Sequence, residues 1–149
     1  MEQRFVIDAS VVVQGFIEDS ESLRVISLLK NLADPITLKL HIPDFCLVEC
    51  TNIFWKRISF HGKPFVDAQE ALNRLMTTPL YIHESTKFLS RALTIGRDYK
   101  LAVYDSVYLA LCERLQLPLI TADIRQAQAA EKLNILLKSL SDFPEFEPE

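Results

Sequence analysis

The chain has 149 residues, of which 49% are hydrophobic and 24% are charged, and its formal net charge is -4 at pH 7. A chain of this length corresponds to one ordinary domain with a full hydrophobic core, so residues 1–149 are expected to form a single domain. The composition excludes collagen-like, mucin-like and disordered chains. The pI near 5.4 excludes a protein that holds nucleic acid by bulk positive charge, but not an enzyme that touches nucleic acid locally through a metal ion.

The sequence also gives an expectation for where in the cell the protein is located. The uncharged stretch from Ala9 to Ile17 is about as long as any in the chain, whereas a membrane span needs about 20 apolar residues. The N-terminus reaches Asp8 after only three apolar residues, which is not the pattern of a signal peptide. The three cysteines, Cys46, Cys50 and Cys112, form no CxxC pair and are expected to be small core residues. We therefore expect a cytoplasmic protein with no membrane partner.

The hydrophobic pattern predicts strands that alternate with helices. Short apolar runs are typical of buried strands, and longer runs with apolar residues every three or four positions are typical of helices. In chain order we expect a strand at 5–7, helices at 10–17 and 21–32, a strand at 37–42, helices at 44–60 and 65–76, a strand at 80–83, helices at 84–96 and 105–115, a strand at 117–121, a helix at 123–132 and a last strand from 135 to 137. Such alternation implies crossover connections, and therefore an α/β fold with a parallel sheet and helices on both faces.

Three acidic residues stand where strands end or helices begin. Asp8 directly follows the first strand, and Asp123 closes the strand Leu-Ile-Thr-Ala-Asp. Both are expected at the carboxyl edge of the sheet, where ligands bind in folds of this class. Asp105 opens a strongly apolar helix. Helix capping explains each of these residues taken singly, because Asp before a helix accepts backbone N–H bonds and opposes the helix dipole.

A fourth acid, Glu49, does not fit the capping explanation. It lies inside a predicted helix that is rich in apolar residues, and it shares one polar stripe with Asn52 and Lys56. A solvated helix face is the alternative for this stripe. Carboxylates gathered in one cleft repel each other unless a cation lies between them, and a hard divalent cation, Mg²⁺ or Mn²⁺, suits oxygen ligands. Such an ion activates water and stabilises charge that builds on a phosphoryl group.

The chain carries no motif for a competing chemistry. It has no GxxxxGK[ST], GxGxxG, GxSxG or HExxH motif. Its three histidines, His41, His61 and His83, are scattered along the sequence, and we expect each at the surface or at a strand end.

Four segments together resemble a known family. They are Val6-Ile7-Asp8-Ala9-Ser10, the stretch from Pro43 to Trp55, the stretch from Tyr104 to Leu111, and Leu119-Ile120-Thr121-Ala122-Asp123. In order and spacing they resemble PIN domains, most closely the VapC-type ribonuclease toxins, and they span essentially the whole chain. The resemblance implies a three-layer α/β/α sandwich with a five-stranded parallel sheet. It also implies Mg²⁺- or Mn²⁺-dependent endoribonuclease activity on single-stranded or structured RNA, a homodimer and, for a toxin, an antitoxin protein bound over the site.

The resemblance also implies roles for individual residues. Asp8, Glu49, Asp105 and Asp123 would hold the metal ion, with Ser10, Asn52 and Thr121 as supporting residues. The chain departs from the family pattern in two places. Cys112 stands where another small residue is usual, and Ile124-Arg125 stands where a basic pair is common.

Contacts with RNA would come from local basic groups. These are Lys56, Arg57, His61 and Lys63 after the Glu49 helix, and Arg91, Arg97 and Lys100 before the Asp105 helix. Solvated helix faces are the alternative for each of these residues. Trp55, Tyr104 and Tyr108 could stack on bases, but we expect them in the core, because aromatic residues at helical spacing usually pack there.

Other functions remain open. A PIN-like module that binds RNA or protein without catalysis and a stand-alone RNA-processing nuclease are both compatible with the sequence. Phosphoryl transfer through Asp8 is disfavoured, because Ser10 stands where haloacid-dehalogenase-like phosphatases carry a second Asp. The apolar stretch from Phe54 to Phe65 is a candidate surface for a protein partner.

Overall fold

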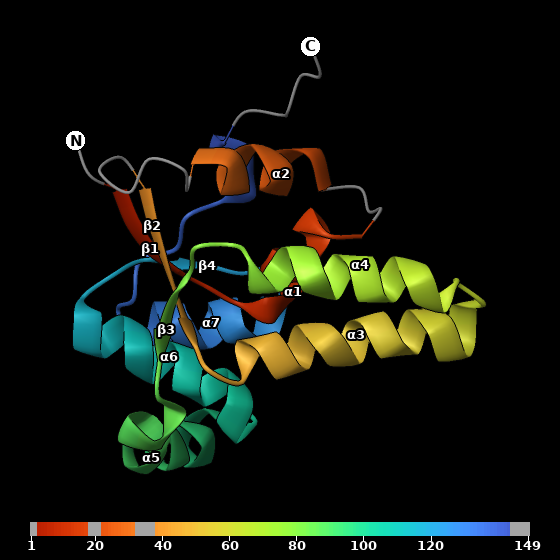
Figure 1. Ribbon diagram of the computed structural model, residues 1–149. Coiled ribbons are helices and arrows are strands. Elements are labelled where there is room, and N and C mark those ends of the chain that lie inside the picture. Colours follow the sequence, from red (N-terminus) through yellow and green to blue (C-terminus); the bar gives the residue numbers. More distant parts are fainter. Residues whose placement is uncertain (1–2, 18–21, 32–37, 144–149) are drawn as a thin grey trace.

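The computed structural model describes residues 3–17, 22–31 and 38–143 (Figure 1). Within these ranges there are four strands, β1 (Gln3–Ile7), β2 (Leu38–Pro43), β3 (Tyr81–His83) and β4 (Leu119–Ile120). The helices are α1 (Ala9–Val12), α2 (Ser22–Lys30), α3 (Cys46–His61), α4 (Phe65–Met76), α5 (Leu89–Tyr99), α6 (Val103–Leu115) and α7 (Ile124–Lys132). Short 3-10 turns lie at Val13–Gly15 (η1), Ser85–Phe88 (η3) and Leu140–Asp142 (η4).

The sheet is parallel, as predicted, with the strand order β3-β2-β1-β4. The predicted fifth strand at 135–137 is wrong, because this segment forms only one parallel bridge, between Leu137 and Leu119. The two backbone hydrogen bonds of the bridge join Leu119 to Leu136 and to Lys138. The partner strand β4 is only two residues long and is preceded by Pro118, which has no N–H group to extend a ladder. The sheet of the described residues therefore has four strands.

Helices cover both faces of this sheet. Helix α6 packs across β1 and β2, and α5 packs on the outer side of α6. Helices α3 and α4 form an antiparallel hairpin that extends away from the sheet (Figure 1). Within the described ranges, no helix combines the length and the apolar character that a membrane span requires.

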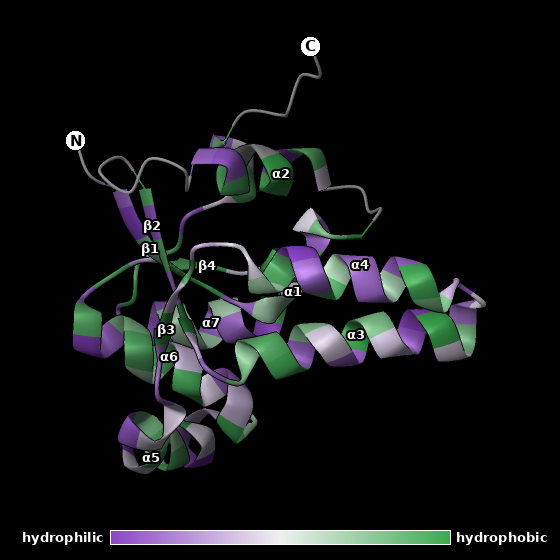
Figure 2. Cartoon of the chain, in the orientation of Figure 1, coloured by the Kyte–Doolittle hydropathy of each residue, from purple (hydrophilic) through white to green (hydrophobic). Residues whose placement is uncertain are grey.

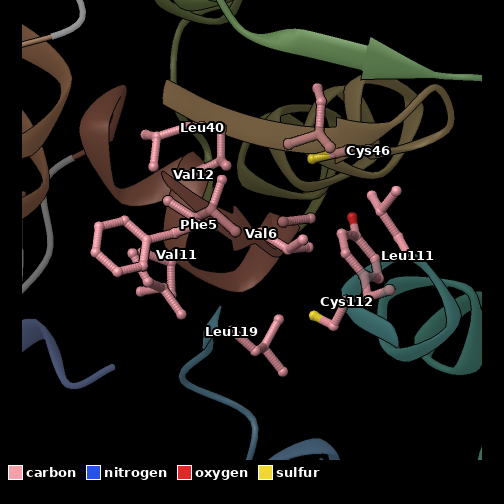
Figure 3. Close-up of a cluster of buried hydrophobic side chains, with 14 of the residues drawn as sticks. Phe5, Val6, Val11, Val12, Leu40, Cys46, Leu111, Cys112 and Leu119 are labelled. Atoms are coloured by element: carbon pink, nitrogen blue, oxygen red, sulfur yellow. The ribbon is translucent and has the colours of Figure 1, made fainter. Parts of the chain in front are cut away.

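The core lies between the strands and the two helical layers. In the close-up, Phe5, Val11 and Val12 gather on one side of Val6, while Leu111 and Cys112 lie on the other (Figure 3). Cys46, Cys50 and Cys112 are all buried and carry free thiols, which confirms the prediction that they are core residues. Burial of each large apolar side chain stabilises the fold by about 1.5–3 kcal/mol.

Several predicted helix ends are displaced in the structure. The helix expected at 10–17 is interrupted, because α1 ends at Val12 and a 3-10 turn follows it. The helix expected at 84–96 begins later, at Leu89, and continues past Gly96 to Tyr99. A Cβ atom at Gly96 would lie 2.8 Å from the Leu101 carbonyl oxygen, so glycine here permits a close approach rather than ending the helix. The predicted boundaries at residues 21, 32 and 37 lie outside the described residues.

Two of the histidines, which are distant in the sequence, lie together on neighbouring strands, and His83 is at the end of β3, as expected. His41 Nδ1 on β2 is 2.9 Å from His83 Nε2 on β3, and His41 is buried. Burial lowers the pKa of His83, and the positive charges of Lys87 and Arg4 lower it further. Neither histidine lines the hollow described in the next subsection.

Candidate active site

The four predicted acids line one hollow of about 290 Å³. Asp8 follows β1 and Asp123 follows β4, which places both at the carboxyl edge of the sheet. Glu49 and Asp105 come from the first turns of α3 and α6. The hollow is also lined by Ala9, Ser10, Asn52, Ile53, Lys56 and Tyr108. The fold therefore gathers residues from positions 8 to 123 of the chain at one place.

Asp8 is the most enclosed of the acids, with a side chain that is 4% exposed. Its Oδ1 accepts hydrogen bonds from the Ser10 hydroxyl at 2.5 Å and from the Val11 N–H at 3.3 Å, and its Oδ2 accepts one from the Thr121 hydroxyl. Burial raises the pKa of Asp8 to about 6, although these three hydrogen bonds lower it, and the charge of Asp123 adds to the rise. Asp8 caps α1, as its position before a helix predicts.

Glu49 is half-buried, which rules out the fully solvated helix face considered for it. Helix α3 begins at Cys46, so Glu49 lies in the first turn rather than deep in the helix, and the cap residue Phe45 makes no side-chain capping bond. The Tyr108 hydroxyl donates to Glu49 Oε1 at 2.8 Å. Burial raises the pKa of Glu49, the hydrogen bond from Tyr108 lowers it, and the charges of Asp105 and Asp8 raise it further. Tyr108 is buried, as expected for a core residue, and is also part of the site. Trp55 and Tyr104 are 52% and 63% exposed, so the expectation that they lie in the core is wrong.

Asp105 and Asp123 are the other two acids that line the hollow. Burial raises the pKa of Asp105, the charge of Asp123 adds to the rise, and the charge of Arg125 opposes it. Asp123 caps α7, because its Oδ1 accepts the N–H of Gln126 at 3.1 Å. The Gln126 side chain is fully buried behind both acids, and no feature of the sequence singled it out.

The donor set fits a hard divalent cation. All four acids supply carboxylate oxygens, and the charges of neighbouring carboxylates raise the pKa of Asp8, Glu49 and Asp105. In the described part of the chain, no three His, Cys, Asp or Glu side chains are grouped closely enough to hold one ion together. Mg²⁺ is usually bound through one or two carboxylates and keeps several of its waters, so it does not need a closed protein cage.

Three of the basic residues that were expected to contact RNA differ in their surroundings. Lys56 lines the hollow itself. Arg91 is held by Glu113 through two hydrogen bonds of 2.8 and 2.9 Å, and Arg97 pairs with Asp98 at 2.9 Å. The expectation that Arg91 and Arg97 are available to phosphates is therefore weakened, whereas Lys56 lies beside the acids.

The fold and the site define an α/β domain whose parallel sheet carries four acids in one hollow at its carboxyl edge. The family model described as PIN domain matches residues 5–132. The chain belongs to the PIN domain family, which confirms the resemblance seen in the sequence. Ribonuclease VapC3 of Pyrobaculum aerophilum is 25% identical over 139 residues, and the match covers 90% of this chain and 98% of the relative.

Solved structures share the fold at low sequence identity. The crystal structure of PAE2754 from Pyrobaculum aerophilum superposes with a TM-score of 0.72 at 18% identity, over 95% of this chain and 94% of the other. The structure of VapBC2 from Rickettsia felis bound to a DNA fragment from their promoter gives a TM-score of 0.62 at 14% identity, over 92% and 98% of the two chains. Both similarities extend over nearly the whole fold.

Proposed function

We propose that this chain is a metal-dependent endoribonuclease that cleaves phosphodiester bonds in RNA. The observation that carries the proposal is the hollow at the carboxyl edge of the sheet, where four acids from four separate elements of a PIN fold meet. RNA is the proposed substrate because the curated relative is named a ribonuclease. The proposed catalytic domain comprises residues 1–149 as a single unit, and its proposed location is the cytoplasm.

The roles of the residues follow from their contacts. Asp8, Glu49, Asp105 and Asp123 are proposed to hold Mg²⁺ or Mn²⁺, with one or two of them bound to the ion directly and the others reaching it through its waters. When bound, this ion supplies an activated water and a positive charge beside the phosphodiester.

Neighbouring side chains orient these acids or meet the substrate. Ser10 and Thr121 donate to the two oxygens of Asp8 and fix its orientation, and Tyr108 does the same for Glu49. Asn52 and Lys56 lie along the same side of α3, where they would meet the sugar-phosphate backbone.

The proposed partners are a second copy of the chain and an antitoxin protein. A groove of about 270 Å³ lies between η1, α3 and α4, lined by apolar side chains together with Arg57, Lys63 and Asp67. Beyond it, Trp55 and Phe60 are exposed on α3. An exposed apolar surface with a polar rim is typical of a protein-binding site. A toxin role for the ribonuclease rests on the likeness to VapC-type toxins and on the presence of this surface.

The proposal is tested by cleavage of a labelled single-stranded RNA by the purified protein. We expect cleavage in Mn²⁺ or Mg²⁺, none in EDTA, and none by the Asp105→Asn variant. Asp98→Asn is the matched control, because it removes the same charge from an exposed position on α5, outside the hollow, and it should cleave normally. A folded wild-type protein that neither cleaves RNA nor melts at a higher temperature in Mn²⁺ would contradict the proposal and favour a non-catalytic binding module.

A further inference from the structure

Gln126 is a polar side chain with no exposed surface at all. It lies in the first turn of α7, whose buried residues are Gln126, Ala129 and Ala130. Glutamine is rarely buried to this extent, because its amide must find hydrogen-bond partners inside the protein. The identity of those partners indicates what the residue does.

The amide of Gln126 joins two parts of the site. Its Nε2 donates to the backbone carbonyl oxygen of Asp105 at 3.1 Å, and its Oε1 accepts from the Thr121 hydroxyl at 2.9 Å. The orientation of the amide is unambiguous, because a carbonyl oxygen only accepts and must therefore face the NH₂ group. The residue thus connects the first turn of α6 to the end of β4.

Thr121 extends this connection to the other acids. Its oxygen accepts from the Asp123 N–H at 3.0 Å, and its one hydrogen is within hydrogen-bond distance of both Asp8 Oδ2 and Gln126 Oε1, which share it. Asp8, Asp105 and Asp123 are therefore all joined to one small network with Thr121 and Gln126 at its centre. Glu49 lies outside the network and is held separately, by the Tyr108 hydroxyl.

Neither core packing nor helix capping explains why position 126 carries a side-chain amide. The capping bond of α7 uses the backbone N–H of Gln126, which any residue except proline supplies. Filling the space beside Ala129 and Ala130 requires only an apolar side chain of similar volume. The two side-chain hydrogen bonds remain, and both fix the positions of segments that carry acids of the site.

We infer that Gln126 is a positioning residue that sets the separation of the Asp105 carboxylate from those of Asp8 and Asp123. Through that separation it determines how strongly the hollow holds a divalent cation. This inference rests on the proposed function, because it concerns the same site. It predicts that loss of the amide weakens metal binding beyond any effect on the stability of the fold.

The test is a titration of the metal-free protein with Mn²⁺ in the absence of RNA, in which the melting temperature is measured at each Mn²⁺ concentration. Gln126→Met keeps the length of the side chain and removes its N–H donors, and Gln126→Leu is a second apolar variant should the first not fold. We expect the half-saturating Mn²⁺ concentration to rise about 10-fold or more, as for other residues that orient metal ligands. Leu75→Ala is the control, because Leu75 is buried on α4 and does not line the hollow; it should lower the melting temperature without changing half-saturation.

Three results would overturn the inference. A folded Gln126 variant with wild-type half-saturation would overturn it alone and leave the proposed function standing. An equal rise in Leu75→Ala would show that lower stability, and not position, weakens binding. A wild-type protein whose melting temperature does not respond to Mn²⁺ would overturn the proposed function together with the inference.

Discussion

Helix α3 carries a partly buried acid near one end and exposed aromatic rings towards the other, and both features are unusual at a protein surface. Near its N-terminus, Glu49 is half-buried in a hollow with three other acids. Towards its C-terminus, Trp55 and Phe60 are 52% and 69% exposed, with their rings 5.7 Å apart. Hydrophobic residues continue to the far end of the α3–α4 hairpin (Figure 2). The N-terminal end of α3 therefore holds a partly buried carboxylate, and its C-terminal part exposes apolar side chains to solvent.

Both features, the buried carboxylates and the exposed aromatic rings, are unfavourable for the isolated chain. Burial of carboxylates disfavours their charged forms, and solvent contact of aromatic rings forgoes hydrophobic stabilisation. Under the proposed function each would be relieved by a different ligand, a cation at the first end and a protein surface at the second. The comparison therefore teaches that the two ends serve separate binding events, and variants at one end should leave the other unaffected.

The largest expected effect is the loss of catalysis in Asp105→Asn. Removal of one of the carboxylates proposed to hold the metal should reduce the rate of RNA cleavage about 1,000-fold, which corresponds to about 4 kcal/mol of transition-state stabilisation. Single-turnover cleavage measures the rate, and far-ultraviolet circular dichroism checks the fold. A rate within tenfold of wild type in a folded variant would remove Asp105 from the site.

The next effect is on stability and its dependence on pH. The pKa of Asp8 rises from 3.8 to about 6 on folding, so the folded protein binds this proton more tightly than the unfolded chain does. The proton's contribution to stability is fully present below pH 4 and is lost as the pH rises through 6, a difference of up to about 3 kcal/mol. Without metal, Asp8→Asn should therefore be more stable than wild type at pH 8, with a smaller change between pH 4 and 7. Urea denaturation at several pH values tests this, and parallel pH profiles would contradict it.

A smaller effect is expected from Tyr108→Phe. The variant removes only the hydroxyl that donates to Glu49 at 2.8 Å, so Glu49 should be oriented less well and cleavage should slow about 10-fold. Tyr99→Phe is the matched control, since Tyr99 lies on α5 and does not line the hollow. Equal cleavage by the two variants would show that the hydroxyl of Tyr108 has no part in the reaction.

The smallest effect on the fold and on catalysis is expected at the other end of α3. Replacement of both Trp55 and Phe60 by Ser should change the free energy of unfolding by less than about 1 kcal/mol, because both side chains are exposed. RNA cleavage should stay within twofold of wild type, while self-association or antitoxin binding weakens. Sedimentation velocity with and without the antitoxin measures this, and unchanged association would show that the exposed rings are not part of the partner surface.

The acids could be predicted from the sequence because local rules place them. Asp8 and Asp123 follow buried strands, Asp105 opens an apolar helix, and Glu49 interrupts the apolar pattern of another. Of the side chains that orient them, Ser10 and Thr121 were expected from the family resemblance, whereas the role of Tyr108 was not. Tyr108 resembles a core residue, and its bond to Glu49 spans 59 positions of the chain.

The same limit applies to Gln126 and to the sheet. Glutamine in a polar helix gives no sign of burial, and only the approach of α6 to β4 provides its partners. The sequence did contain a signal for both residues. Tyr108 lies three residues after Asp105, and Gln126 lies three residues after Asp123, and residues at this spacing are neighbours on a helix surface. The prediction of a fifth strand was wrong for the same reason, because pairing at Leu137 depends on β4, in another part of the chain. The end of α5 was wrong for a local reason, because Gly96 permits the close approach of the Leu101 carbonyl oxygen and does not end the helix.

The most direct test of the central claim, that the four acids hold a divalent cation, is calorimetric titration of the metal-free protein with Mn²⁺ at neutral pH. The wild-type protein and the exposed-site control Asp98→Asn should bind with the same affinity, and Asp8→Asn should bind at least about 10-fold more weakly. Equal binding by all three proteins, or no saturable binding by the wild type, would contradict the claim.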